Sequence, residues 1–396
     1  MAWRKSEMAG MDIRKNGCRD YKPKITHIVE AFGGGVFAVM ADIVDRTRQD
    51  FDITVLYGGR YCTPEGFERY FDRGVRFVEI ENFTREISIR KDVKAFLEIR
   101  ARLKEIQPDI VHLHSSKAGA LGRFAVPIKN RRIIYNPHSY AFLNTETNAL
   151  KRFVYKTAEK AAALRNCVIV ACSEGEYKEA VKLSTDVRLI RNGVDIRGLG
   201  AEIERLPDRP FDPANIKFCT CGRITAQKNP SVFNEVAESF PRHQFTWIGD
   251  GELRGLLTAP NIQITGWRSR EYALTCMNDH DVFLLPSLFE GLPIALLEAM
   301  FLKKLCVAFD VIGTSDVIYH NKNGYLCCGT DDFKDAIRSI LNGGPGAGRM
   351  RDNARDSVVT SFNADAMAES YRALYTELMA DTEKSSANYT RREFVS

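Results

Sequence analysis

The sequence predicts an α/β fold with two Rossmann-like domains, each a doubly wound parallel sheet, that face a central cleft. Three observations predict it. First, 396 residues exceed what one hydrophobic core usually organises and suit two domains. Second, short and almost continuously apolar segments alternate with amphipathic segments, as in parallel strands covered by helices on both faces. Third, this alternation stops at a polar stretch with three prolines, which predicts a linker and domain boundary near residues 195–215, and then starts again.

Each half of the chain has its own series of strands and helices. The first half predicts strands at 23–31, 52–58, 76–81, 109–115, 132–139, 168–173 and 187–194, and helices at 34–47, 63–71 and 88–106. The second half predicts strands at 216–224, 244–251, 262–267, 281–287 and 305–310, and helices at 230–240, 252–257, 271–279, 292–302, 331–342 and 363–379. The expected parts are therefore a tail at 1–22, a first domain at 23–200, a second domain at 201–363, a helix at 364–381 and a tail at 382–396.

Composition excludes several classes of protein. The polar first 20 residues do not fit a secretory signal peptide, and no run of about 18 apolar residues predicts a membrane-spanning helix. The ten cysteines follow no zinc-binding spacing and are expected as free thiols in a reducing, cytoplasmic setting. No segment resembles a nucleic-acid-binding motif. Residues 1–195 carry 34 Lys and Arg against 25 Asp and Glu, so the first half is expected to meet an anionic partner.

Residues 31–38, AFGGGVFA, form a glycine-rich turn before a helix. Gly33, Gly35 and Ala38 formally match the dinucleotide-binding pattern G-x-G-x-x-G/A. That pattern needs an acidic residue at the end of the second strand, where this sequence has Tyr57 followed by two glycines. We therefore expect the helix N-terminus to approach a phosphate, with a plain tight turn as the alternative.

Residues 221–230, CGRITAQKNP, place two cations between a strand and a helix. Arg223 offers a fork of donors and Lys228 offers a point charge, so together they suit a diphosphate. A solvated basic loop is the alternative.

Residues 286–300, PSLFEGLPIALLEAM, keep two glutamates in an otherwise apolar stretch. A buried carboxylate without a partner is unfavourable, so we expect groups outside the stretch to pair with them. Pro293 predicts that a helix begins there. Glu290 then lies in the loop before the helix, where it can accept hydrogen bonds from sugar hydroxyls. Glu298 lies inside the helix, where it can accept from a ribose diol; a solvent-facing glutamate is the alternative.

The segments VHLHSSKAG, YNPHSY and ACSEGE place polar side chains at the ends of first-half strands. His114, Lys117, His138 and Ser173 are therefore expected to face the cleft, because ligands of such folds bind beyond the carboxyl ends of the strands. His138 is the strongest candidate for a catalytic role, since it follows Asn136 and Pro137 in a constrained loop.

Together these residues resemble glycosyltransferase family 4, the retaining nucleotide-sugar transferases with the GT-B fold. The resemblance covers about residues 24–380 and depends on E-x7-E from Glu290 to Glu298, GR-x4-K at 222–228 and RNGVD at 191–195. The segment HSSKAGALGR at 114–123 resembles the members that build bacterial capsule, exopolysaccharide or O-antigen chains.

The resemblance implies a metal-independent hexosyltransferase without a cofactor, which moves a sugar from a nucleotide sugar, expected to be a UDP-sugar, to an acceptor hydroxyl. The first domain would bind the acceptor, the second the donor, and the helix at 364–381 would cross back to the first domain. The implied catalytic residues are Arg223 and Lys228 on the diphosphate, Glu290 on the transferred sugar and His138 near the reacting centre. The other implied substrate-binding residues are Gly34, Gly35, His114, Lys117, Ser173, Asn192, Gly222, Gly266, Trp267, Gly291, Leu292, Pro293 and Glu298.

Residues 151–165, KRFVYKTAEKAAALR, predict a basic amphipathic helix, preceded by Arg123, Lys129, Arg131 and Arg132. Such a helix can lie on an anionic bilayer. With the basic first half, it favours a saccharide acceptor linked to polyprenyl diphosphate, and a cytoplasmic protein that is peripheral on the inner membrane. An ordinary solvated face is the alternative.

Two other functions remain open at this point. A sugar-nucleotide epimerase of the GT-B fold would use the donor cleft without an acceptor, but the HSSKAG segment and E-x7-E argue against it. A catalytically inactive, nucleotide-sugar-binding member of the fold is disfavoured because Arg223, Lys228, Glu290 and Glu298 are all present.

Overall fold

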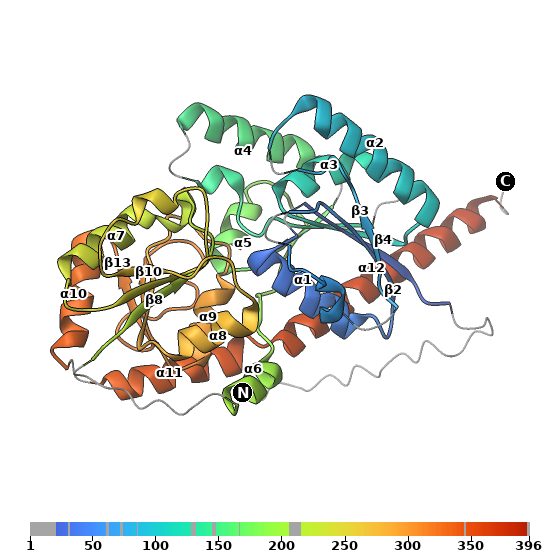
Figure 1. Cartoon of the computed structure of the whole chain (residues 1–396). Coiled ribbons are helices and arrows are strands. Elements are labelled where there is room, and N and C mark those ends of the chain that lie inside the picture. The colour runs from blue at the N-terminus through green and yellow to red at the C-terminus, as the bar shows by residue number, and fades with distance from the viewer. Residues whose placement is uncertain are drawn as a thin grey trace.

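The computed structural model describes residues 21–393, apart from 31, 61–62, 72–73, 85, 128–131, 145–147, 166, 206–214 and 344–345, and for 381–393 it describes the backbone alone. Two parallel sheets, each flanked by helices, lie side by side (Figure 1). The expected N-terminal tail falls almost entirely outside the described residues.

The first sheet has seven parallel strands in the order β3-β2-β1-β4-β5-β6-β7. Its strands are β1 (Lys24–Val29), β2 (Asp52–Tyr57), β3 (Arg76–Glu79), β4 (Ile110–His114), β5 (Ile133–Asn136), β6 (Val168–Ala171) and β7 (Val187–Leu189). Every residue of β4, β5 and β6 is buried, which explains why these segments are apolar on both faces. All seven strands coincide with segments predicted from the sequence.

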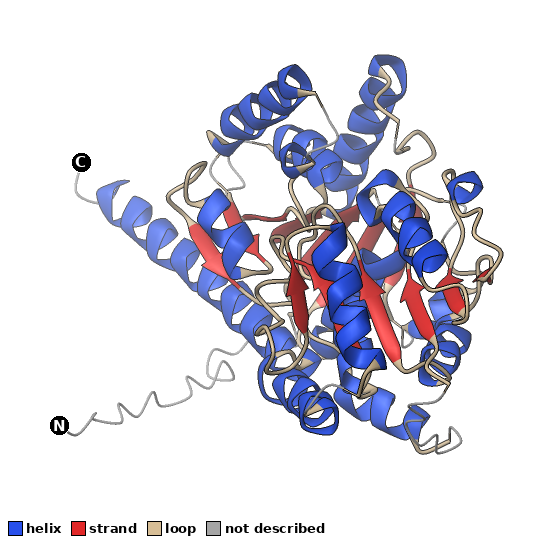
Figure 2. Ribbon diagram, turned by 90° about the vertical axis from the view of Figure 1, so that its left-hand side faces the viewer, coloured by secondary structure: helices blue, strands red, loops and turns tan. Residues whose placement is uncertain are grey.

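Helices cover both faces of this sheet, and Figure 2 shows strands of the molecule flanked by helices. Ile53 belongs to the same core as Met40 of α1, whereas Leu56 belongs to the core that contains Ile99 of α2. Successive strand residues point to opposite faces, so α1 and α2 lie on opposite sides. The first-domain helices are α1 (Gly34–Thr47), α2 (Ile89–Ile106), α3 (Ser116–Ala125), α4 (Ala149–Ala163), α5 (Glu174–Ala180) and α6 (Ile196–Ile203), with short 3₁₀ turns η1 (Phe67–Tyr70) and η2 (Ala141–Leu143).

The second sheet has six parallel strands in the order β10-β9-β8-β11-β12-β13. They are β8 (Phe218–Cys221), β9 (Phe245–Ile248), β10 (Ile262–Ile264), β11 (Val282–Leu285), β12 (Leu305–Phe309) and β13 (Tyr325–Cys327). Its helices are α7 (Pro230–Ser239), α8 (Arg270–Asn278), α9 (Ile294–Phe301), α10 (Thr330–Leu341) and α11 (Ala347–Ser361), with 3₁₀ turns η3 (Ala226–Lys228) and η4 (Arg254–Leu256). The two sheets are thus both doubly wound, as the sequence predicts.

The last helix, α12 (Ala364–Glu393), leaves the second domain and packs against α1 of the first (Figure 1, red). The hydroxyl of Tyr375 lies 2.8 Å from Nδ1 of His112, and the hydroxyl of Tyr371 accepts a hydrogen bond of 2.7 Å from Nδ2 of Asn136. Where the helix begins, the N–H of Ala364 donates to the carbonyl of Val194, and the N–H of Val194 donates to the carbonyl of Phe362, at 3.0 and 2.9 Å. The two segments that connect the domains are therefore paired with each other.

A glycine is required at this pairing. A Cβ atom on Gly193 would lie 2.4 Å from the carbonyl carbon of Asn363. This distance is too short for a Cβ atom beside backbone, so no other residue fits here.

Several elements differ from the prediction. Helix α6 lies inside the stretch that the sequence predicts as a linker, whose remainder at 206–214 is outside the described residues. Helix α11 and strand β13 were not predicted, because α11 is strongly polar and β13 is a three-residue edge strand. The helices predicted at 63–71 and 252–257 are only short 3₁₀ turns.

At the C-terminus, residues 382–393 continue α12 instead of forming the predicted tail, since no glycine or proline interrupts this segment. The eight cysteines among the described residues are all unpaired, as expected; Cys18 and Cys62 lie outside them.

We predict that Tyr375→Phe lowers the free energy of unfolding by about 1–3 kcal/mol, because it leaves a ring nitrogen of the buried His112 without a partner. Urea unfolding followed by circular dichroism measures this. The matched control is Thr376→Val at the next, exposed position of α12, which should change the value by less than about 0.5 kcal/mol. Equal stabilities of Tyr375→Phe and the control would contradict the prediction.

Candidate active site

The loops that follow the carboxyl ends of both sheets meet each other. A Cβ atom on Gly291, after β11, would lie 3.0 Å from the backbone nitrogen of Ser139, after β5. The amide of Asn192, after β7, donates to the carbonyl of Leu292 at 3.4 Å, and the N–H of Gly175 donates to Asp316, after β12, at 3.0 Å. The predicted residues His138, Asn192, Glu290, Gly291 and Leu292 are thus brought to one place.

Glu290 is 6% exposed and obtains its counter-charge from another segment. The ammonium of Lys228, at the end of η3, donates to Oε1 of Glu290 at 2.6 Å. Gln227 supports this pair, because its side-chain amide donates to the carbonyl of Phe289 at 3.0 Å. The expectation that an outside group neutralises this glutamate is confirmed, and its partner is one of the two predicted diphosphate ligands.

Arg223 differs from Lys228 because its side chain is uncommitted. It is half-buried, and it forms no hydrogen bond or ion pair within the described part of the chain. The preceding Gly222 has a φ of 144°, and its carbonyl accepts a hydrogen bond of 2.9 Å from the indole of Trp247. A Cβ on Gly222 would lie 3.1 Å from Cε of Lys228, so this glycine brings the backbone close to the lysine. Arg223 therefore follows a glycine that lies against Lys228, and among the described residues its guanidinium has no partner that would keep it from binding an anion.

Glu298, 7% exposed, is paired in the same way with Arg270 at the start of α8. The Oε1 atom of Glu298 accepts from the guanidinium at 2.8 and 2.9 Å. Burial opposes the charge of Arg270, but Glu298 outweighs it and raises the pKa of Arg270 above its ordinary value. The solvent-facing alternative for Glu298 is therefore wrong. Helix α9 begins at Ile294, one residue after the predicted start, and Pro293 is its N-cap.

The loop after β5 holds His138 in an unusual backbone conformation. His138 and Ser139 have φ values of 51° and 85°, in the left-handed region that non-glycine residues rarely adopt. The buried carboxylate of Glu176 stabilises this shape, since it accepts hydrogen bonds from the backbone N–H groups of Ser139 and Cys172 at 2.7 and 2.8 Å. Strained backbone of this kind clusters at functional sites. The sequence did not indicate Glu176, although it lies in the ACSEGE segment.

Behind His138 lies a group of buried imidazoles that contains the predicted residue His114. Nε2 of His138 lies 3.0 Å from Nδ1 of His114, and Nε2 of His114 lies 3.0 Å from Nδ1 of His27. His27, His112 and His114 place ring nitrogens within 4.8 Å of one another, a spacing at which they could share a metal ion. Both nitrogens of His112 already have partners, Tyr375 and Asn136, at 2.8 and 2.5 Å. These histidines therefore take part in a hydrogen-bonded network.

Three residues predicted to contact substrate have side chains that already bind partners within the first domain. His114 is fully buried behind His138. Ser173 is fully buried too, and its hydroxyl accepts from the N–H of Glu176 as the N-cap of α5. Lys117 is committed within the first domain, where its ammonium binds the carbonyl of Thr84 at 2.5 Å and the carboxylate of Asp92 at 2.6 Å. Each side chain lies near a strand end, as predicted, but packing turns it away from the cleft.

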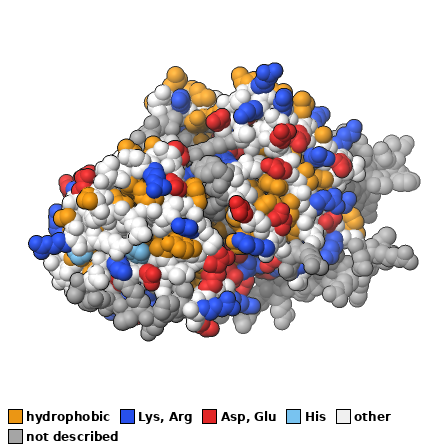
Figure 3. All heavy atoms as spheres, viewed as in Figure 1, with side chains coloured by type: hydrophobic (Ala, Val, Ile, Leu, Met, Phe, Trp, Pro, Cys, Tyr) orange, Lys and Arg blue, Asp and Glu red, His pale blue; other side chains and the backbone are white. Residues whose placement is uncertain are grey.

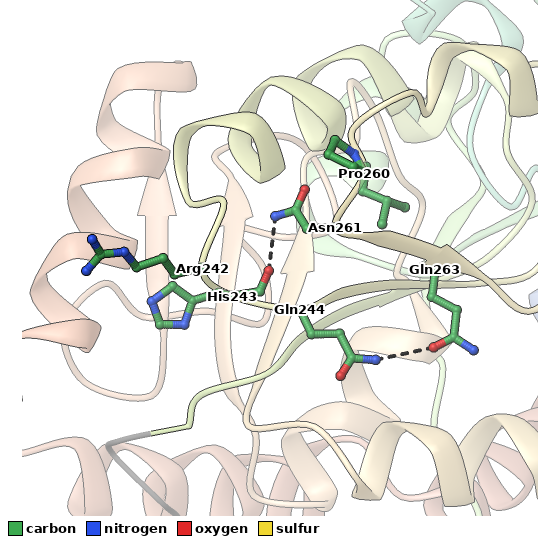
Figure 4. Close-up of a pocket in the computed structure, with 7 residues that line it drawn as sticks. Arg242, His243, Gln244, Pro260, Asn261 and Gln263 are labelled. Carbon is green, nitrogen blue, oxygen red and sulfur yellow. Dashed lines mark hydrogen bonds between the residues drawn. The ribbon is translucent and has the colours of Figure 1, made fainter.

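The remaining predicted residues lie at strand ends with open surroundings. Gly34 and Gly35 begin α1, and a Cβ on Gly35 would lie 3.6 Å from Ile294 at the start of α9, so the N-termini of the two helices approach each other. Gly266 has a φ of 72° after β10, and Trp267 is 43% exposed. A hollow of about 370 Å³ lies elsewhere, near the amino ends of β9 and β10 (Figure 4). Because it lies at the opposite ends of these strands, it is separate from the cleft.

Comparisons with known proteins agree with this geometry. Residues 33–197 match the model of Glycosyltransferase Family 4, and residues 215–343 match that of Glycosyl transferases group 1. The chain is 29% identical over 367 residues, 84% of this chain and 91% of the relative, to the UDP-Gal:α-D-GlcNAc-diphosphoundecaprenol α-1,3-galactosyltransferase of Escherichia coli. It is 23% identical to the capsular polysaccharide biosynthesis glycosyltransferase CapM of Staphylococcus aureus, over 76% of this chain and 84% of the relative.

Solved structures agree on the fold. The sucrose-phosphate synthase of Thermosynechococcus elongatus superposes with a TM-score of 0.75 at 16% identity, over 91% of this chain and all of that one. Anabaena HepE, solved with UDP-glucose, superposes with a TM-score of 0.72 at 16% identity, over 89% and 99% of the two chains. Two doubly wound domains with the GR-x4-K and E-x7-E residues at one cleft, and family models on both halves, show that the chain belongs to the family 4 glycosyltransferases of the GT-B fold.

Proposed function

We propose that this protein transfers a sugar from a UDP-sugar to a hydroxyl of a polyprenyl-diphosphate-linked saccharide, with retention of configuration and without a metal ion. The observation that carries the proposal is the group of Arg223, Lys228 and Glu290 at the N-terminus of α9, where both domains meet. It combines cations for a diphosphate with a carboxylate for sugar hydroxyls.

The charges in the cleft support this chemistry. As the bond between the sugar and the diphosphate breaks, negative charge develops on the β-phosphate, where Arg223, Lys228 and the positive end of α9 can stabilise it. Because these groups supply the positive charge, no bound metal ion is needed for it. The acceptor oxygen forms its bond to the sugar carbon on the face that the phosphate leaves, and its proton passes to the departing phosphate oxygen.

The Lys228–Glu290 pair gives both side chains a place before the donor binds. A diphosphate can replace one carboxylate oxygen as a partner of the ammonium, which carries three N–H donors. Glu290 then keeps an oxygen for a sugar hydroxyl. In the same way, Arg270 holds one oxygen of Glu298, and the second oxygen is available to a ribose hydroxyl.

The donor and the acceptor follow from the Escherichia coli relative, whose name specifies UDP-galactose and a GlcNAc-diphosphoundecaprenol acceptor. At 29% identity, the proposal takes the nucleotide and the class of acceptor from this relative, and takes neither the individual sugars nor the linkage. A sugar-nucleotide epimerase would convert the UDP-sugar alone, and an inactive member would bind it without transfer, so an assay with and without acceptor separates the three.

We predict that Arg223→Ala and Lys228→Ala each reduce turnover at least a hundredfold, because one preorganised donor commonly contributes about 3–4 kcal/mol to the transition state. Transfer of labelled sugar from UDP-galactose or UDP-glucose to a GlcNAc-diphosphate lipid measures this. The control is Arg338→Ala, which removes an exposed arginine of α10 and should leave turnover unchanged. A variant that stays folded by circular dichroism and keeps near-normal turnover would refute the proposed role.

A surface of the first domain supports peripheral contact with an anionic membrane. The buried residues of α4 are only Glu159 and Ala162 among its described positions, so nearly all of the helix faces outward. Leu150 and Phe153 are 71% and 68% exposed, and the basic residues around them are Lys151, Arg152, Lys156 and Lys160. Figure 3 shows apolar and basic side chains along the upper edge, where α2 and α4 lie in Figure 1. Within the described residues, no helix is long and apolar enough to cross a bilayer.

The basic residues that precede α4 do not all belong to this surface. Arg123 of α3 is fully buried, and its guanidinium binds Glu159 of α4 at 2.6 Å. This ion pair holds α4 against α3, so Arg123 is not part of the outer surface. Arg132 pairs with Asp109 at 3.8 Å, and Lys129 and Arg131 lie outside the described residues. The proposed membrane surface is therefore the exposed side of α4.

We predict that the protein binds vesicles containing phosphatidylglycerol at low salt and is released at high salt, because contact depends on basic side chains as well as on inserted apolar ones. The double variant Leu150→Ser, Phe153→Ser should bind at least about tenfold more weakly, since it removes two exposed apolar side chains. Tyr319→Ser, which removes a side chain that is 59% exposed on the second domain, is the control. No sedimentation of the unmodified protein with these vesicles at low salt would exclude the contact.

A further inference from the structure

We infer that His27 and His114 fix the tautomer of His138, so that His138 presents its Nδ1–H to the cleft as a hydrogen-bond donor toward an oxygen of the donor sugar. The inference rests on the proposed function for the identity of that sugar, but the tautomer itself does not depend on it.

The three imidazoles form one continuous chain into the core. His27 lies on β1, His114 ends β4 and His138 follows β5. Their two hydrogen bonds are both 3.0 Å long, and neighbouring rings are inclined by only 17° and 13°. Since β1, β4 and β5 are adjacent strands, the chain runs across the sheet from its centre to the cleft.

All three rings are neutral at ordinary pH. Burial lowers the pKa of His27 to about 3 and that of His138 to about 4, and burial with the neighbouring histidines lowers the pKa of His114 well below its usual range. Each ring therefore carries one N–H and one lone pair. Two ring-to-ring hydrogen bonds can then form only if all the N–H groups point in the same direction along the chain.

The buried end of the chain decides this direction. Nε2 of His27 has no solvent exposure and no hydrogen-bond partner among the described residues. If the N–H groups pointed inward, this atom would be a buried N–H without an acceptor, which is among the rarest defects in folded proteins. If they point outward, it is a buried lone pair without a donor, and buried acceptors without a partner occur more often in folded proteins than buried N–H groups without one. The outward direction gives His27 Nδ1–H to His114, His114 Nδ1–H to His138, and Nδ1–H on His138.

The neighbouring His112 does not supply an alternative partner. The amide nitrogen of Asn136 donates to Val170 and to Tyr371, at 3.0 and 2.7 Å, so its oxygen is the acceptor for Nε2–H of His112. Nδ1 of His112 then accepts from the hydroxyl of Tyr375. His112 is thereby saturated and leaves the chain of three independent of it.

At the cleft end, His138 has one ring nitrogen left. Its Nε2 is bound to His114, and its Nδ1 has no partner within the described part of the chain. Glu176 fixes the backbone of this loop, and the backbone of Gly291 packs against it, so the ring is held beside the Glu290 loop. A neutral Nδ1–H cannot accept the proton of the acceptor hydroxyl. His138 therefore binds and orients a sugar oxygen, and His27 and His114 are positioning residues.

Two variants at one buried position separate positioning from packing. Asparagine can place its amide N–H₂ where the Nδ1–H of His27 lies, so His27→Asn keeps the donor to His114. His27→Leu fills the site without a donor, and the direction of the chain is then no longer fixed. His320→Gln, at an exposed position of the second domain, is the control.

The test is ¹⁵N spectroscopy of the full chain labelled at histidine, without ligand near pH 7.5. The chain has seven histidines, and single His→Gln variants assign their ring signals. We expect His138 to be protonated at Nδ1 in the unmodified protein and in His27→Asn, and to become a mixture of tautomers in His27→Leu. A His138 protonated at Nε2 in the unmodified protein, or an unchanged tautomer in His27→Leu, would overturn the inference.

Kinetics then tests the sugar contact. With a saturating acceptor, kcat/KM for the nucleotide sugar should fall about tenfold in His27→Leu, and should recover in His27→Asn to within about threefold of the unmodified enzyme. Equal losses in the two variants would overturn the positioning role. Absence of transfer from every nucleotide sugar would contradict the proposed function, while the spectra would still decide the tautomer.

Discussion

Two carboxylates, each more than nine-tenths buried, set the conditions that the second domain has to meet. Glu290 lies in the loop before α9, and Glu298 lies eight residues later within the helix. Each needs a cation from elsewhere in the chain. Lys228 comes from the turn after β8, and Arg270 comes from the start of α8. A buried charge left without its partner is destabilising by about 3–5 kcal/mol, so these two pairs fix the loops around the donor side of the cleft.

The first domain stabilises its side of the cleft by different means. There, the polar groups beneath His138 are neutral imidazoles, an amide and two tyrosine hydroxyls, which bind one another without a net charge and leave Nε2 of His27 without a partner among the described residues. The carboxylate of Glu176 is used on the backbone N–H groups of the strained loop, and that of Glu30, after β1, is paired with Arg60. The second domain thus lines the cleft with cation–carboxylate pairs, which suit a diphosphate, while the imidazole of His138 is backed by uncharged hydrogen-bonding groups, which suit a sugar.

Local patterns were enough to predict every strand except β13 and to single out Lys228 and Glu290 as charged site residues. They were not enough to predict the directions of individual side chains. A strand buried on both faces is apolar along its whole length, so its position is visible in the sequence, whereas α6, α11 and β13 depend on contacts with distant segments. The need of Glu290 for a partner follows from its surroundings, but that Lys228 supplies it depends on tertiary packing. Similarly, His114, Lys117 and Ser173 are near strand ends as predicted, yet packing directs them inward.

The pairing of Val194 with Phe362 and Ala364 has a consequence for how the two halves can move. The chain leaves the first sheet and returns to it at the same point, and the backbone there approaches so closely that only glycine fits at residue 193. Both covalent connections therefore share one pivot at the edge of the cleft. A rotation of the two domains about this point would stretch neither connection, and α12, bonded to His112 and Asn136, would move with the first domain.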